Sequence, residues 1–125
     1  MPPRRCPCGT GLPYAECCSP RHDGSAPAAT AEQLMRSRYS AFAVGDAGYL
    51  LRTWHPATRP PALDLDPAVR WSGLEVLATT AGGLLAAEGT VEFVARFRHG
   101  GADGEQHEVS RFAREDGAWR YVDGR

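Results

Sequence analysis

All four cysteines of the chain lie within 13 residues near its start, in the run C-P-C-G-T-G-L-P-Y-A-E-C-C. Cys6 and Cys8 form one close pair, Cys17 and Cys18 form a second, and eight residues separate the pairs. The glycines and the proline between them permit the tight turn that brings the two pairs together. Four thiolates at about 2.3 Å are the ligands of a tetrahedral Zn²⁺ ion. The spacing therefore predicts one zinc ion per chain.

Other uses of these cysteines are disfavoured but stay open. The start of the chain has no apolar segment of the kind found in secretion signals, which predicts a cytoplasmic protein with reduced thiols. Disulfide bonds are therefore the weaker alternative. A redox dithiol is weaker still, because the chain contains no C-x-x-C sequence. Four cysteine ligands leave no open coordination position, so we expect the zinc to be structural rather than catalytic.

The charge pattern disfavours two classes of partner. The 125 residues carry a net charge of −1, which provides no overall field for binding nucleic acid, and no apolar stretch is long enough to span a membrane. Four arginines on the expected strands could form a basic stripe, but acidic residues are interleaved with them. These are Arg96, Arg98, Arg111 and Arg114, with Glu92, Glu105 and Glu108 between them. We expect a solvated face of salt bridges there.

Helices are predicted in the first half of the chain. Residues 19–29 are rich in Pro, Ser, Gly and Ala and are typical of a linker, so we expect residues 1–20 and 30–125 to be separately stable parts. Thr30 and Gln33 form a capping-box pattern that begins a helix, and Gly45 is suited to end it. Asp46 is a suitable N-cap for a second helix that stops before Pro56.

Strands are predicted in the second half. Residues 71–80, 91–98, 105–114 and 119–122 are apolar, β-branched or alternating, and Asp116-Gly117 is a strong hairpin signal. Helices followed by an antiparallel meander indicate an α+β fold, with the helices packed on one face of a curved sheet.

Arg38 is the most unusual residue of the predicted first helix. It lies within the apolar stripe formed by Ala31, Leu34, Met35, Tyr39 and Phe42. A buried cation needs a partner, so we expect Arg38 to be paired with an acidic side chain, Asp123 first and Glu75 second. The alternative is that its apolar stem packs while the guanidinium extends into solvent.

Several collinear stretches resemble a known family. They are L-M-R-S-R-Y-S-A-F (34–42), T-W-H-P (53–56), F-V-A-R-F (93–97), S-R-F (110–112) and W-R-Y-V-D-G (119–124). With the cysteines, they are similar to the bacterial YchJ family of proteins with a SEC-C zinc-binding motif. The resemblance implies a nuclear-transport-factor-like, cystatin-like fold with a conical cavity, and a metal, but no reaction. Where the motif usually has Gly-Lys-Lys, this chain has Gly11, Leu12 and Pro13.

Two classes of function follow. In the first, the zinc knuckle binds a protein partner, as the resembling tail of the preprotein translocase ATPase does. In the second, the cavity holds a small molecule or an active site of the isomerase or dehydratase type, for which the fold alone is a weak argument. The candidate cavity residues are Arg38, Tyr39, His55, Glu75, Arg111 and Asp123. No catalytic motif is present, so we favour the first class, with a homodimer through the open sheet face as a further expectation.

Overall fold

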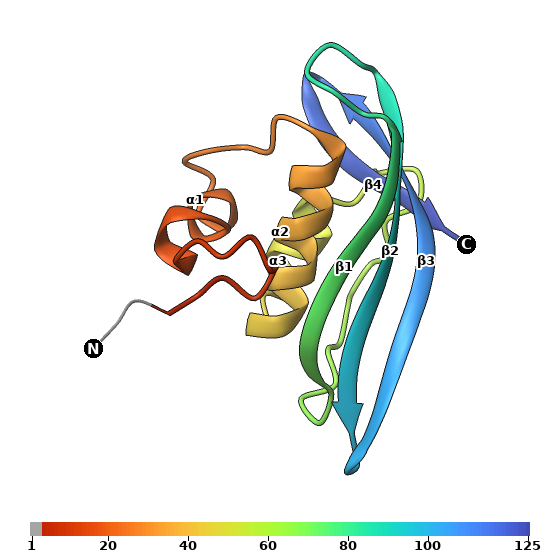
Figure 1. The fold of residues 1–125 in the computed structure, drawn as a ribbon. Coiled ribbons are helices and arrows are strands. Elements are labelled where there is room, and N and C mark those ends of the chain that lie inside the picture. Colours follow the sequence, from red (N-terminus) through yellow and green to blue (C-terminus); the bar gives the residue numbers. More distant parts are fainter. Residues whose placement is uncertain (1–3) are drawn as a thin grey trace.

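The computed structural model describes residues 4–125, which form three layers (Figure 1). The N-terminal segment lies on one side of the helices and the sheet lies on the other. In chain order, the elements are η1 (Tyr14–Glu16), α1 (Ser19–His22), α2 (Ala31–Val44), α3 (Ala47–Arg52), β1 (Arg70–Ala81), β2 (Glu88–His99), β3 (Ala102–Glu115) and β4 (Ala118–Gly124). No helix in residues 4–125 is long and apolar enough to cross a membrane.

The two main helices begin and end as the sequence predicts. The hydroxyl of Thr30 accepts a hydrogen bond from the backbone N–H of Gln33, and Gly45 ends α2 in the left-handed conformation at φ +80°. The carboxylate of Asp46 accepts from the N–H of Tyr49 and begins α3. Because a single residue joins Gly45 to Ala47, the short connection turns α3 back along α2.

The four strands form one antiparallel sheet in the order β1-β2-β3-β4, which confirms the predicted meander. Asp116 and Gly117 both have positive φ and form the tight turn between β3 and β4. Two irregularities in the pairing of β1 with β2, at residues 71–73 and 76–78, interrupt the register. Such bulges bend a strand and increase its twist, which accounts for the curvature visible in Figure 1.

Helix α2 is covered on two sides. Its apolar stripe faces the sheet, where Leu34, Met35 and Tyr39 pack in one core with residues of β2, β3 and β4. Ser40 and Ser37 of this helix are completely buried as well, Ser40 against Cys6 of the N-terminal segment and Ser37 against Tyr49 of α3. The small side chain of Ser40 lets the N-terminal segment approach the helix closely.

The segment predicted to be a linker contains α1 and is attached to the body by specific contacts. The imidazole of His22 is buried, and its Nε2–H donates to the Ser37 carbonyl at 2.8 Å. The other ring nitrogen then accepts from the Tyr14 hydroxyl at 2.6 Å. The carbonyl of His22 accepts from Arg52 of α3. These contacts join the N-terminal segment to both helices, while the predicted domain boundaries stay a prediction.

Candidate metal centre and pocket

The four cysteines converge as the sequence predicts. Their Sγ atoms all lie within 4.8 Å of one another, with 3.6 Å between Cys8 and Cys17 and 4.0 Å between Cys17 and Cys18. Thiolates at about 2.3 Å from one tetrahedral ion are themselves about 3.8 Å apart. A disulfide needs about 2.05 Å between sulfurs, and all four cysteines are free. The arrangement therefore fits a single metal ion and not a disulfide pair.

A small hairpin brings the two cysteine pairs together. The N–H of Cys6 donates to the Leu12 carbonyl at 2.8 Å, and Arg5 pairs with Pro13. Gly9 and Gly11 have φ near +86° and +87°, a conformation that side chains disfavour. Glycine at these two positions therefore lets the chain reverse between Cys8 and Cys17 without strain.

The thiols cannot all ionise without a cation. A hydrogen bond from Cys18 lowers the pKa of Cys8 to about 4, and the same contact raises the pKa of Cys18. Burial raises the pKa of Cys17. The neighbouring thiols thus stabilise one thiolate. The negative charge of that thiolate then disfavours the ionisation of a second thiol close to it. A bound metal ion would remove this opposition because its positive charge stabilises every thiolate.

The cysteine cluster lies between the hairpin and α2. Cys6, Cys8 and Cys18 are buried and belong to the main core, and Cys17 is half-buried. The guanidinium of Arg36 donates to the Cys8 carbonyl at 2.8 Å, which links the hairpin to the helix. A closed, buried site of this kind supports a structural role rather than a catalytic one.

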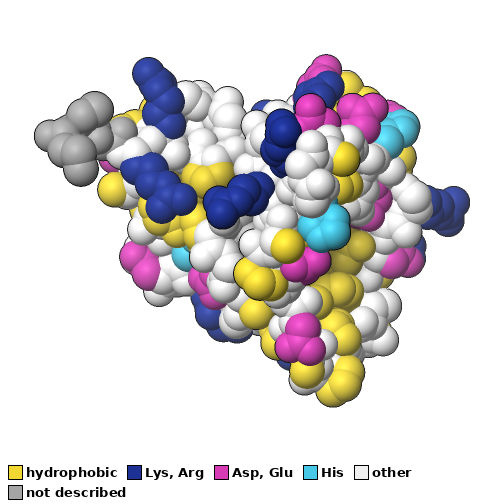
Figure 2. Space-filling view, turned by 90° about the horizontal axis from the view of Figure 1, so that it is seen from below, with side chains coloured by type: hydrophobic (Ala, Val, Ile, Leu, Met, Phe, Trp, Pro, Cys, Tyr) yellow, Lys and Arg dark blue, Asp and Glu magenta, His cyan; other side chains and the backbone are white. Residues whose placement is uncertain are grey.

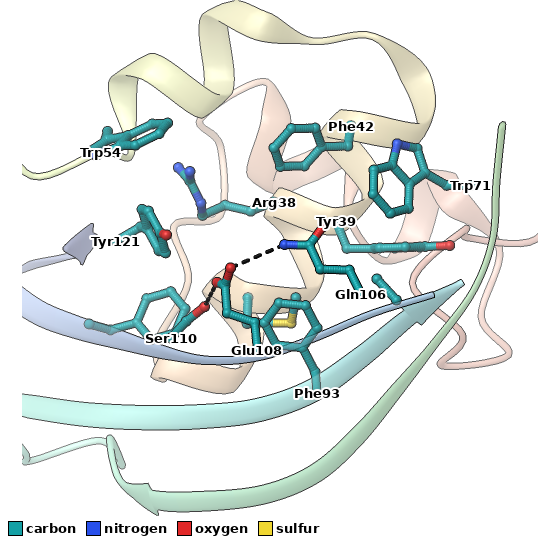
Figure 3. A pocket seen from close by; sticks show the side chains of 13 residues that line it. Arg38, Tyr39, Phe42, Trp54, Trp71, Phe93, Gln106, Glu108, Ser110 and Tyr121 are labelled. Carbon is teal, nitrogen blue, oxygen red and sulfur yellow. Dashed lines mark hydrogen bonds between the residues drawn. The ribbon is translucent and has the colours of Figure 1, made fainter. Parts of the chain in front are cut away.

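A separate pocket of about 200 Å³ lies between the helices and the concave face of the sheet (Figure 3). Two of the six predicted cavity residues, Arg38 and Tyr39, line it. The remaining lining is mostly aromatic and apolar, with three polar residues of β3. It consists of Met35, Phe42, Trp54, Trp71, Phe93, Ala95, Gln106, Glu108, Ser110, Phe112 and Tyr121.

Arg38 points inward, as predicted, but its predicted acidic partners were wrong. Its Nη1 donates to the Leu50 carbonyl at 2.8 Å and to the Thr53 hydroxyl at 2.7 Å. Its guanidinium carbon lies 4.5 Å from the ring centre of Tyr121 and 5.2 Å from that of Trp54. Neutral acceptors and aromatic faces therefore replace the expected carboxylate, and burial lowers the pKa of Arg38 to about 10.

The other four predicted cavity residues lie outside this pocket. Asp123 forms a two-pronged salt bridge with Arg111, and Glu75 is paired with Arg96. His55 is held at the surface, where its Nδ1 accepts from a backbone N–H and its Nε2 lies 3.3 Å from Glu115. Glu75, Arg111 and Asp123 lie on outward-facing strand positions, and His55 lies in the segment after α3, outside the strands. None of the four therefore faces the pocket.

The acidic residue that does line the pocket is Glu108, which sequence reasoning did not place there. Gln106, Glu108 and Ser110 alternate along β3 in phase with the buried Phe112, so all three face the helices. Gln106 donates to one oxygen of Glu108 at 3.1 Å, and Ser110 donates to the other (Figure 3). The sequence does indicate this position, because Ser110 and Glu108 lie two and four residues before Phe112 and alternation along a strand puts all three on one face.

The outer face of the sheet carries part of the predicted salt bridges, but Glu108 lines the pocket instead, and Arg114 donates to the backbone carbonyls of Ala86 and Leu84. Arg96 contacts Glu75 and Glu105, and His107 lies 2.6 Å from Glu92. Arg96 and its acidic neighbours thus neutralise one another across three strands. A homodimer through this face stays a prediction.

Family models match both parts of the chain. A model described as the YchJ middle NTF2-like domain matches residues 30–124, and a SEC-C motif model matches residues 5–20. A UPF0225 protein of Streptomyces coelicolor is 57% identical over 99% of this chain and 97% of its own length. A UPF0225 protein of Chromobacterium violaceum is 56% identical over 95% of this chain and 90% of its own length.

Solved structures agree with the fold. The solution structure of a SEC-C motif containing protein from Rhodopseudomonas palustris is 38% identical, covers 96% of each chain and has a TM-score of 0.84. The crystal structure of a SEC-C motif containing protein from Psychrobacter arcticus is 34% identical, with a TM-score of 0.79 over 94% of this chain and 80% of that chain. The expected α+β fold with an NTF2-like domain is confirmed, and the chain belongs to the YchJ-like family of SEC-C motif proteins.

Proposed function

We propose that the chain is a zinc-containing interaction protein, in which one structural Zn²⁺ ion fixes a small hairpin that binds a protein partner. The observation that carries the proposal is the convergence of four Sγ atoms within 4.8 Å in a closed, mostly buried site. Four thiolates in tetrahedral array are typical of zinc and of iron–sulfur chemistry. Zinc is favoured because the cluster has the dimensions of a site for one ion.

The surface that the metal would hold rigid is the loop between the cysteine pairs. Leu12 at its tip is 48% exposed although it is large and apolar. Arg4 and Arg5 of the adjoining strand are exposed as well. Figure 2 shows basic side chains next to hydrophobic ones close to the N-terminal residues. An apolar tip bordered by arginines suits a protein segment with apolar and acidic side chains.

Metal analysis of the purified protein tests the first half of the proposal. We expect about one zinc ion per chain with four thiols that react only after a chelator or acid removes the metal. Less than about half an equivalent of any metal, in a protein whose four thiols are intact and freely reactive, would contradict a structural zinc site.

A matched pair of leucine variants tests the second half. Leu12 and Leu77 have nearly equal exposures of 48% and 45%, but Leu77 lies on β1 and not in the loop between the cysteine pairs. Proteins captured from a lysate of the source cells should be retained by Leu77→Ser and lost with Leu12→Ser, at unchanged zinc content. Equal capture by both variants would show that the hairpin is not the docking surface.

A further inference from the structure

The pocket contains a buried cation that no carboxylate contacts directly, although the charge of Glu108 in the same pocket acts on it. The side chain of Arg38 is 5% exposed, and its two hydrogen bonds go to uncharged acceptors. Within residues 4–125, no carboxylate lies at ion-pair distance from it. Burying a charge without a counter-charge is costly, so such a residue is commonly kept for a ligand.

Arg38 has side-chain donors that its own hydrogen bonds leave unused. Both hydrogen bonds come from Nη1, which leaves the N–H groups of Nε and Nη2 without a protein acceptor among the described residues. The fully buried side-chain donors that lack a partner there are only Trp54 Nε1 and Arg120 Nε. The free N–H groups of Arg38 are therefore reached by solvent, and the pocket is the space that Arg38 lines.

A fixed carboxylate lines the same pocket. Glu108 accepts from Gln106 and Ser110, which leaves further lone pairs on its two oxygens. It lies so close to the backbone of β4 that a Cβ at Gly124 would come within 2.3 Å of its carboxyl carbon. Glycine at this position therefore makes room for the carboxylate, which adds a hydrogen-bond acceptor to the pocket.

The size and walls of the pocket limit what it can hold. A cavity of about 150 Å³ lined by apolar side chains binds benzene, so about 200 Å³ accommodates one ring with a substituent. Tyr39, Phe42, Trp71 and Phe93 form aromatic walls. Trp71 contacts Tyr39 and Phe42 with ring centres 5.9 Å apart and the rings inclined, an arrangement that favours a further flat ring beside them.

We propose that this pocket binds a single-ring aromatic carboxylate that also carries a hydroxyl or amino donor. The carboxylate accepts from the free N–H groups of Arg38, and the donor is directed to Glu108. The donor matters because it offsets the repulsion between the ligand's carboxylate and Glu108. This site is separate from the cysteine cluster, since none of the cysteines lines it.

Titration of the zinc-loaded full chain with benzoate, 3- and 4-hydroxybenzoate and benzylamine, followed by NMR, tests the proposal. Benzoate should give saturable shifts of the Trp54 and Trp71 indole signals, and one of the hydroxybenzoates should bind more tightly. Benzylamine should not bind. Absence of saturable shifts with both hydroxybenzoates at about 10 mM, or binding of benzylamine in their place, would overturn the proposal.

Variants assign the binding to the named residues. Arg38→Met should weaken benzoate binding at least about tenfold, because a charge-assisted hydrogen bond is lost. Arg111→Met, on the outer face of the sheet, should bind as the parent does. Glu108→Gln should remove the advantage of the hydroxybenzoate over benzoate. If Arg38→Met fails to fold, Ala95→Met narrows the pocket without changing its charges, and undiminished binding by that variant would refute the site.

Discussion

The Sγ atom of Cys6 lies 3.4 Å from the hydroxyl oxygen of Ser40, so the metal-ligand cluster touches the middle of α2. Ser40 has no exposed surface, and its neighbour one turn earlier, Ser37, has none either. The hairpin thus covers the side of α2 that faces away from the sheet. Metal binding and the packing of the main helix are therefore expected to be coupled.

Removing the metal should destabilise the whole protein. Structural zinc supplies about 10–16 kcal/mol of apparent binding free energy in small modules, and here the ligands are part of the main core. We expect a chelator to lower the midpoint of the single thermal transition by about 10 °C or more, as measured by circular dichroism.

Deletion of residues 1–25 gives the complementary measurement. The sequence alone predicts a body that folds without them, whereas the buried contacts of His22 and Ser40 argue for mutual support. A truncated chain with the transition midpoint of the parent would show that the two parts are separately stable and would contradict the coupling.

Enlarging the contact point should loosen the metal site. Ser40→Leu places a branched side chain against Cys6, and overpacking of this kind costs about 1–3 kcal/mol. We expect faster zinc loss to a colorimetric chelator and a lower free energy of unfolding. Ser72→Leu, on an exposed position of β1, is the control. If the two variants lost zinc at equal rates, the packing of α2 and metal binding would not be coupled.

The elements with local signals could be predicted from the sequence. Thr30, Gly45 and Asp46 each act through neighbours within four residues, so their roles do not depend on the rest of the fold. The cysteine cluster is equally local, because eight residues separate its pairs. The composition of the strands also predicted the salt bridge between Arg96 and Glu105, but it wrongly put Glu108 on the same face.

The features that depend on distant packing could not be predicted in the same way. The serine-bearing side of α2 has the composition of an exposed surface, and it is interior because the hairpin covers Ser40 and α3 covers Ser37. Arg38 was correctly placed inward, but its partners come from α3 and from β4, and no spacing rule links those elements to it. Residues 19–29 have the composition of a linker, yet His22 and the Ala29 carbonyl attach them to the body through contacts with Ser37 and Trp119.

Replacing Arg38 should cost little stability. Burial lowers the pKa of Arg38 to about 10 from 12.5, so the folded state holds fewer protons than the unfolded state between these values, and stability rises with pH there. At neutral pH the buried positive charge of Arg38 therefore lowers the stability of the folded state. Arg38→Met should therefore leave the free energy of unfolding within about 1 kcal/mol of the parent, or raise it, in urea titrations. A loss of about 3 kcal/mol or more would instead indicate that Arg38 is chiefly structural.

The outer pair of Arg111 and Asp123 allows a direct pKa measurement. Arg111 donates through Nε and Nη2 to the two carboxylate oxygens, each at 2.6 Å, and these hydrogen bonds hold the pKa of Asp123 below its usual value. Because the folded-state pKa is the lower one, the pair contributes stability above the unfolded pKa of about 3.9 and loses it as the pH falls through the folded value. Arg111→Gln should return the pKa of Asp123 toward its usual value in a carboxyl ¹³C titration. Arg96→Gln should leave it unchanged, since Arg96 contacts Glu75 and Glu105 instead. If Asp123 titrates at the same pH in the parent and in Arg111→Gln, the two-pronged contact does not exist in solution.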